Sequence, residues 1–553
     1  MADRRISAIM LLTATALLIG ALPPAAFAES QPASPITAPS DQLTRLEALG
    51  LYQNAAEGAL DPEIWMGMKR SEAIELMQSM PAFSPIAPTQ RLIQGMLLSG
   101  FNMDRLSNDT QPQDGNDLFT LRLEKLVDGG AYDQAFNLYS NVQDTPYHPR
   151  LAQAGITAMM MAGKKSLACL EAQSAIETFP EDGFLKTVHA LCHATRASGT
   201  AAQEDVAALK DFGQALLEKI AENKHFRFDY TPENFSALPR LTQAALIAEK
   251  RLNVPALDSA SARKVPAAHV QALLNGGDLS ADNRFLLTAQ AVAYGLEAPR
   301  AMAALFAETL KPAAGPAARA AAPAKKAPAV KASADWEALA ALYMKASTAP
   351  DDASALTALR EAFGYADRYG VTTLAPFADI AMRLTPRGLA MPEFMTGFRL
   401  FNALGQDVPK PWVDAVESHY GPFPDMPLYT RLLLAAALHE NAPSVRAMKL
   451  GNLRGFLPLL DKKDAFFMTN VIENVDNDKI VHNNADKIYE KEFDLTGNLD
   501  YVMPTMSVWN RLLQAGSEKR VGETVLLSTI ILRETAPQDL YPGLFYDVFA
   551  NLS

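Results

Sequence analysis

The stretch 166–197 decides the fold class, with SLACLEAQSAIET at 166–178, the turn FPEDG at 179–183 and FLKTVHALCHATRA at 184–197. We predict an antiparallel helical hairpin, because Pro and Gly interrupt two helix-forming segments. The turn is centred near position 180.5, and Cys169 and Cys192 each lie 11.5 positions from that centre. Residues equidistant from the turn lie side by side, within the roughly 5.5 Å Cα separation that a disulfide needs. We therefore predict a Cys169–Cys192 disulfide, which would stabilise the fold by about 3 kcal/mol in the chain-entropy model.

The same hairpin carries an alternative set of metal ligands. His189, Cys192 and His193 are spaced i, i+3 and i+4 and share a helix face, with Cys169 opposite. Two imidazoles and two thiolates would satisfy a tetrahedral zinc ion. The two cysteines could therefore form a disulfide, join a zinc site or remain as two buried thiols. We expect the disulfide, because an oxidising compartment consumes thiolates. The histidines are then expected to be ordinary residues at the boundary of the hairpin.

Helical periodicity continues on both sides of this hairpin. Apolar and small residues recur at helical spacing in the stretches 206–220, 285–292 and 356–366. Such spacing marks amphipathic helices with one buried stripe. Alternating strand patterns bounded by hairpin turns are missing from the sequence. We therefore predict an all-α protein.

A weak internal repeat extends the prediction from single helices to their arrangement. GAYDQAFNLYSNV at 130–142 aligns with GKKSLACLEAQSAI at 163–176, with Gly130 over Gly163 at an offset of 33. The period resembles the tetratricopeptide class of helical hairpins, although that class's Trp, Gly, Tyr and Pro signature is incomplete here. The resemblance covers about 70 residues. It implies an α-solenoid of stacked hairpins that presents an extended curved surface.

The N-terminus predicts export. Arg4 and Arg5 precede an uncharged apolar stretch at 6–22, and AFA at 26–28 places small residues before a cleavage site at Glu29. Residues 1–28 are therefore predicted to be a secretory signal peptide, and the mature protein to be periplasmic. The alternative is an uncleaved anchor in the inner membrane, although the apolar stretch is short for about 30 Å of hydrocarbon. We expect no transmembrane segment in the mature chain.

Composition divides the mature chain into two predicted helical blocks. Residues 29–42 are Pro- and Ser-rich and are expected to form a flexible leader, and the Ala/Pro/Lys-rich stretch 311–333 a disordered linker. These boundaries predict an N-terminal helical-repeat domain at 43–310 and a C-terminal helical domain at 334–553. Within the second block, TVLLSTIIL at 524–532 is apolar on every side and is expected to be sandwiched between other helices.

Several landmarks resemble a family of exported bacterial α-helical proteins that is uncharacterised. They are LDPEIW at 60–65, MP at 80–81, RLI at 91–93, LLS at 97–99 and RVGETVLL at 520–527. The resemblance spans most of the mature chain. It implies an exported helical protein but no activity, cofactor or catalytic residue.

Charge and missing motifs exclude several functional classes. The net charge of −12 is a poor match for nucleic acid. LMQSMP at 76–81 resembles one element of the lytic transglycosylases, but the only preceding Glu-Ser pair, at 29–30, lies in the leader. His439 and Glu440 lack the second histidine of a zinc protease motif, and no Gly-rich phosphate loop is present. We predict no catalytic residue, no cofactor and no metal site.

These patterns favour a non-enzymatic periplasmic scaffold or adaptor. Its expected partner is a protein or peptide, with the cell wall as a further partner, because stacked helical hairpins commonly present binding surfaces. The alternative is a peptidoglycan-acting enzyme or accessory with an unrecognised site at 334–553. A third and smaller alternative is a structural spacer anchored by an uncleaved N-terminus.

Overall fold

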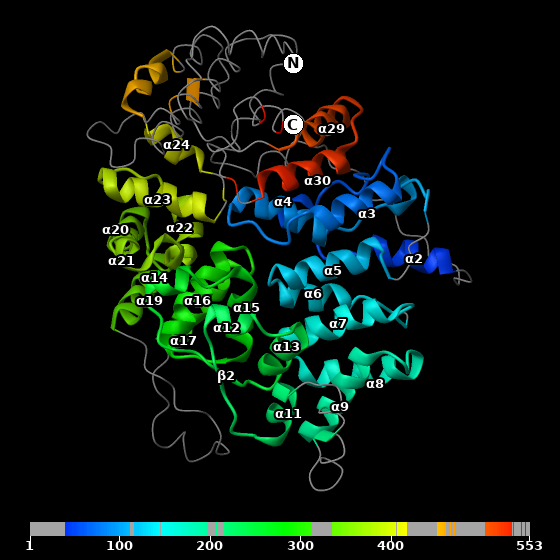
Figure 1. Ribbon diagram of the computed structural model, residues 1–553. Coiled ribbons are helices and arrows are strands. Elements are labelled where there is room, and N and C mark those ends of the chain that lie inside the picture. The colour runs from blue at the N-terminus through cyan, green and yellow to red at the C-terminus, as the bar shows by residue number, and fades with distance from the viewer. Residues whose placement is uncertain are drawn as a thin grey trace.

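The computed structural model is mostly helical in the residues that it describes (Figure 1). It describes residues 39–110, 115–143, 145–196, 215–310, 334–404, 408–416, 451–460 and 504–533, together with isolated positions between them. The predicted all-α class is confirmed, because β structure in these ranges is confined to very short strands and isolated bridges. The predicted signal peptide and the predicted linker at 311–333 lie outside the described residues, as does 473–494, a polar stretch rich in Asn and Asp.

The first third of the chain contributes α2 (Pro39–Ala48), α3 (Arg70–Ser79), α4 (Ala87–Leu98), α5 (Leu118–Asp128), α6 (Tyr132–Tyr139), α7 (Pro149–Met161), α8 (Lys165–Thr178) and α9 (Gly183–Arg196). The middle contributes α11 (Ala215–Glu222), α12 (Pro232–Ser236), α13 (Arg240–Ala248), α14 (Ser259–Arg263), α15 (Ala267–Gly276), α16 (Ala281–Ala293) and α17 (Pro299–Thr309).

The last part contributes α19 (Ala334–Ser347), α20 (Asp352–Phe363), α21 (Ala366–Tyr369), α22 (Ala378–Arg383), α23 (Met391–Ala403), α24 (Lys410–Val416), α29 (Met506–Ser517) and α30 (Val521–Leu532). Short 3-10 helices join them: η2 (Ala55–Glu57), η3 (Met103–Arg105), η4 (Val371–Phe377) and η5 (Leu457–Leu459).

Helices α5 to α9 pack in sequence order, each against the next. The two glycines aligned by the repeat, Gly130 and Gly163, have φ of +83° and +71° and stand between α5 and α6 and between α7 and α8. Glycine is favoured there because other residues are strained at positive φ. Helices α13 and α15, from the middle of the chain, also pack against α7.

Three parallel two-residue strands were not predicted. They are β1 (Phe228–Asp229), β2 (Leu252–Asn253) and β3 (Gly277–Asp278), in the order β1–β2–β3, with Phe228 opposite Leu252 and Leu252 opposite Gly277. Each strand lies between two consecutive helices: β1 between α11 and α12, β2 between α13 and α14, and β3 between α15 and α16. Two residues are too few to produce an alternating pattern, so the sequence carries no periodic signal for these strands.

The hydrophobic core is distributed differently from the expected division at 311–333. Helices α17 and α19, on either side of that stretch, pack together. Phe285 of α16 stacks on Trp336 of α19, with ring centroids 5.0 Å apart. One hydrophobic core cluster therefore contains residues from both 262–306 and 336–413. The composition of the segment between them does not determine which helices pack together on either side of it.

The C-terminal helices return to the beginning of the fold. Helix α30 packs against α3, α4 and α29, and the view in Figure 1 places α29 and α30 beside the first helices. The N–H of Gly522 donates to the carbonyl oxygen of Ile64 at 2.8 Å, so two of the sequence landmarks meet here. The expectation that 524–532 is enclosed is confirmed, because nearly all of α30 is buried. Within the described ranges, no helix is both long and apolar enough to cross a membrane.

Candidate functional site

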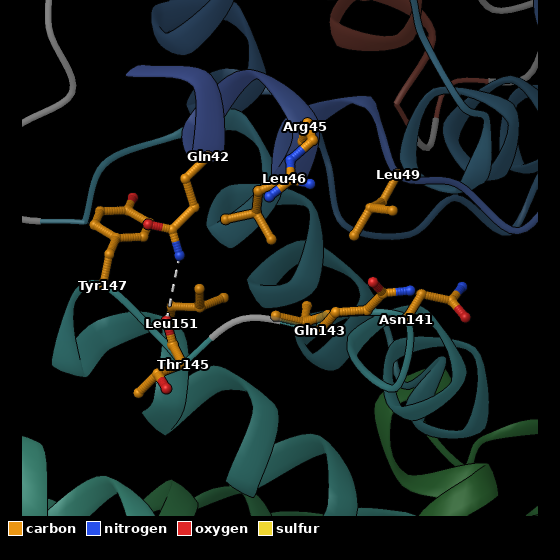
Figure 2. A pocket seen from close by; sticks show the side chains of 10 residues that line it. Gln42, Arg45, Leu46, Leu49, Asn141, Gln143, Thr145, Tyr147 and Leu151 are labelled. Atoms are coloured by element: carbon orange, nitrogen blue, oxygen red, sulfur yellow. Dashed lines mark hydrogen bonds between the residues drawn. The ribbon is translucent and has the colours of Figure 1, made fainter. Parts of the chain in front are cut away.

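A small pocket lies between α2 and the segment that connects α6 to α7 (Figure 2). We call it the α2 pocket, and its volume is about 160 Å³. Its lining comes from Gln42, Arg45, Leu46, Leu49, Asn141, Val142, Gln143, Thr145, Tyr147 and Leu151. The site thus combines aliphatic side chains with side-chain amides.

Two opposed walls give the α2 pocket its chemistry. Figure 2 shows the α2 side chains on one side and the 141–151 side chains opposite them. Leu46 and Leu151 are buried and supply apolar surface. The Gln42 amide nitrogen donates to the carbonyl oxygen of Thr145 at 3.5 Å and links the two walls.

A cluster of polar groups adjoins the pocket. We call it the Glu47 cluster, and it consists of the buried Glu47, Arg70 and Asp117 together with the more exposed Tyr147. Glu47 and Arg70 form an ion pair and are 1% and 2% exposed. The second carboxylate oxygen of Glu47 accepts the N–H of Leu118 at 3.0 Å. Burying two charges is tolerated because each has partners.

Asp117 joins the pocket to the N-terminus of α5. Its carboxylate accepts the N–H of Thr120 at 2.8 Å, as an N-cap residue does. The hydroxyl of Tyr147 donates to the same carboxylate. Tyr147 itself is 37% exposed and lines the pocket. Asp117, the N-cap residue of α5, therefore holds the Tyr147 side chain in place at the pocket.

Burial and neighbouring charges shift the pKa values of Glu47 and Tyr147. Burial raises the pKa of Glu47, while the nearby Arg70 opposes that shift by favouring the carboxylate. Burial, followed by the charge of Asp117, raises the pKa of the Tyr147 hydroxyl, which therefore stays protonated and donates. The arrangement therefore positions the Tyr147 side chain at the pocket.

Arg122 organises the backbone around the cluster. Its guanidinium donates to the carbonyl oxygens of Leu97, Glu47, Leu49 and Ser99 at 2.8, 3.2, 2.8 and 2.8 Å. Complete burial lowers the pKa of Arg122 to about 9. This side chain ties α2, α4 and α5 together, and α2 is one wall of the pocket.

The structure brings the two sequence-predicted cysteines together. Cys169 of α8 and Cys192 of α9 have Cα atoms 5.8 Å apart and are linked as a disulfide. His189 and His193 lie on α9 with ring centroids 4.2 Å apart. No group of three or more His, Cys, Asp or Glu residues with metal-binding geometry occurs in the described part of the chain.

A second hydrogen-bonded constellation surrounds His269 and was not predicted. The hydroxyl of Tyr230 lies 3.0 Å from Nδ1 of His269, and the hydroxyl of Ser236 lies 3.2 Å from Nε2. Burial lowers the pKa of His269 to about 4. A base this weak does not activate a serine near neutral pH, and the third member is a neutral phenol in place of a carboxylate. We interpret the constellation as structural.

Sequence reasoning missed the α2 pocket because its walls are far apart in the chain. Residues 42–49 and 141–151 carry no motif. The leader predicted at 29–42 ends at Gln42, but the structure is helical from Pro39, where α2 begins. The one usable signal was Asp117 before an apolar helical stretch, since Asp is a favoured N-cap residue.

Comparisons with protein-family models, curated proteins and solved structures give no match to this chain.

Proposed function

We propose that the protein is a non-enzymatic periplasmic scaffold or adaptor whose α2 pocket anchors one side chain of a bound protein or peptide. The supporting observation is the size of the pocket, about 160 Å³. Small-molecule sites commonly enclose roughly 300–1,000 Å³. A smaller pocket is suited to a single apolar side chain of the kind that dominates the binding energy of protein interfaces.

The lining chemistry supports a peptide as the occupant. Leu46, Leu49 and Leu151 provide apolar surface for a side chain. Gln42 and Gln143 carry amides, and each amide has both a donor and an acceptor for the main chain of an extended peptide. The peptide stems of the cell wall share this chemistry, so they are the second source of ligand. The net charge of −12 favours neutral or basic partners.

Filling the pocket tests the proposal. The variant Gln143→Trp places a large ring at an exposed position of the lining. Gln173→Trp, on the exposed face of α8, is the matched control. Each purified mature protein is cross-linked in periplasmic extract and, separately, sedimented with intact sacculi. Bound proteins are then identified by mass spectrometry.

We expect the wild type and Gln173→Trp to retain the same specific partner, and Gln143→Trp to lose at least nine-tenths of it. Equal capture by all three proteins would contradict the role of the pocket. Capture of nothing above background would contradict the scaffold. Release of muropeptides from the sacculi by the wild-type protein would instead support the peptidoglycan-acting alternative.

A further inference from the structure

A pair of histidines on α9 remains after the disulfide has taken both thiols. His189 and His193 are the only two of the eight histidines in the sequence that are separated by fewer than five positions. Both lie on α9, where residues at i and i+4 project from the same face. Their ring centroids are 4.2 Å apart. His193 is exposed and His189 is half-buried, so solvent reaches the pair.

We propose that His189 and His193 form a two-imidazole binding site for a divalent transition-metal ion. Neutral imidazole is a common ligand of zinc, copper and nickel. Two imidazoles one helical turn apart can coordinate a single ion, leaving its other positions to water or to a ligand from a partner. Ligands in this class favour Cu²⁺ over Zn²⁺ and Ni²⁺ by the general order of divalent-metal affinity.

The hairpin holds the two ligands in place before the metal binds. The Cys169–Cys192 disulfide joins α8 to α9, and Cys192 lies between the two histidines in the sequence. A rigid helix reduces the entropy lost when both imidazoles engage one ion. Because the thiols are bonded to each other, the site consists of nitrogen ligands and differs from the Cys₂His₂ zinc site considered from the sequence.

Two basic residues flank the pair and set its electrostatics. Lys186 precedes His189 and pairs with Glu181 at 3.0 Å, which offsets its charge. Arg196 follows His193 by three positions and is exposed. At the surface, water and salt screen the repulsion between Arg196 and a bound cation. Removing the Arg196 charge should therefore tighten metal binding by a small factor.

Equilibrium dialysis of the oxidised mature protein against CuCl₂ or ZnCl₂ at pH 7.5, with metal analysis, tests the site. We expect one saturable equivalent. His189→Gln and His193→Gln should each weaken binding roughly a hundredfold, since each removes half of a two-point attachment. His225→Gln, at an exposed single histidine, should bind as the wild type does. Arg196→Gln should bind the metal slightly more tightly.

Thermal unfolding provides a second readout. A ligand that binds the folded state raises the melting temperature, so Zn²⁺ should raise it for the wild type and His225→Gln but not for His193→Gln. Absence of saturable binding by the wild type would overturn the proposal. So would wild-type affinity in His189→Gln and His193→Gln. Metal binding that survives in those two variants but disappears in the double variant Cys169→Ser/Cys192→Ser would assign the ligands to the thiols instead.

Discussion

At the scale of single residues, the fold near the α2 pocket depends on polar side chains that are almost completely buried. Arg122 donates to four backbone carbonyl oxygens, which lie in the two segments 47–49 and 97–99. Its guanidinium also lies over the ring of Phe101, 5.3 Å from the centroid. A planar group with several donors in fixed directions suits this role, which a lysine could fill only in part.

Replacing Arg122 should be strongly destabilising. Arg122→Met removes the donors and leaves buried carbonyl oxygens without partners, and we expect the free energy of unfolding to fall by about 3 kcal/mol. Urea unfolding followed by circular dichroism measures the change. Arg105→Met, at a side chain that is 52% exposed, is the control and should change stability by less than about 1 kcal/mol. Equal losses in the two variants would contradict the role of Arg122.

His269 should make the stability of the protein depend on pH. Its pKa is about 4 in the folded state, against an ordinary value near 6.5. The unfolded chain therefore takes up the proton first as the pH falls. The contribution of His269 to the free energy of unfolding is therefore complete above pH 6.5. It is lost progressively as the pH falls toward 4, by at most about 3 kcal/mol.

The variant His269→Gln isolates this contribution. Urea unfolding at pH 7.5, 5.5 and 4.5 should show that the stability difference between wild type and His269→Gln shrinks as the pH falls. The exposed His225→Gln should follow the pH profile of the wild type. Parallel profiles for wild type and His269→Gln would mean that His269 is not the titrating group.

At the scale of elements, the α8–α9 hairpin is the part of the fold that the sequence predicted in most detail. The segment boundaries, the turn and the facing cysteines agree with the structure within a few residues. The reason is that a hairpin is local, so the position of the turn fixes which residues face each other. The placement of α30 against α3 and α4 has no such local determinant.

Loss of the disulfide should weaken the hairpin without unfolding its helices. We expect Cys169→Ser, Cys192→Ser and the double variant to lose a similar amount, about 3 kcal/mol, because each removes the same cross-link. Far-ultraviolet circular dichroism at 25 °C should not change. Thiol titration of the denatured, unreduced wild type should find no free thiol, and two after reduction. Two reactive thiols before reduction would refute the bond.

Gly522 is required where α30 meets the loop before α3. A Cβ atom at this position would lie 2.7 Å from the carbonyl oxygen of Ile64, which is closer than real contacts allow. Gly522→Ala should therefore destabilise the protein, although alanine normally favours a helix by about 1 kcal/mol. Gly183→Ala, where nothing lies within 4 Å of the added atom, should be neutral or slightly stabilising.

Hydrogen–deuterium exchange locates the effect of Gly522→Ala. Faster exchange is expected in α30 and in the neighbouring α3 and α4, with α8 and α9 unchanged. If Gly522→Ala and Gly183→Ala leave exchange in α30 equally slow, the contact with Ile64 does not hold α30 in place.

At the scale of the whole molecule, the chain forms a stack of helices whose two ends meet. Helices α5 to α9 follow one another, α13 and α15 pack against α7, and α30 packs against α3 and α4 (Figure 1). The α-solenoid expected from the repeat stays a prediction. Recognition through a small pocket at α2 is compatible with it.

We predict that the whole protein is exported to the periplasm and cleaved before Glu29. A C-terminally tagged protein expressed in a Gram-negative bacterium should appear in the periplasmic fraction, and its N-terminal residue should be Glu29. The physical reason is the short uncharged stretch 6–22 followed by small residues at 26 and 28, which a signal peptidase accepts. Intact protein in the membrane fraction would support the uncleaved anchor, and retention in the cytosol would contradict both.

The sequence by itself determined the helical class, the local hairpin with its facing cysteines and the enclosure of 524–532, because periodicity and turn position act over a few residues. Tertiary structure alone decided that α17 packs on α19 across 311–333, that α30 closes onto α3 and α4, and that residues 42–49 meet 141–151 to form the α2 pocket. These contacts join segments far apart in the chain. Many helices of this chain have apolar faces of similar composition, so composition does not show which two faces pack together. The complementary shapes of the packed side chains decide it.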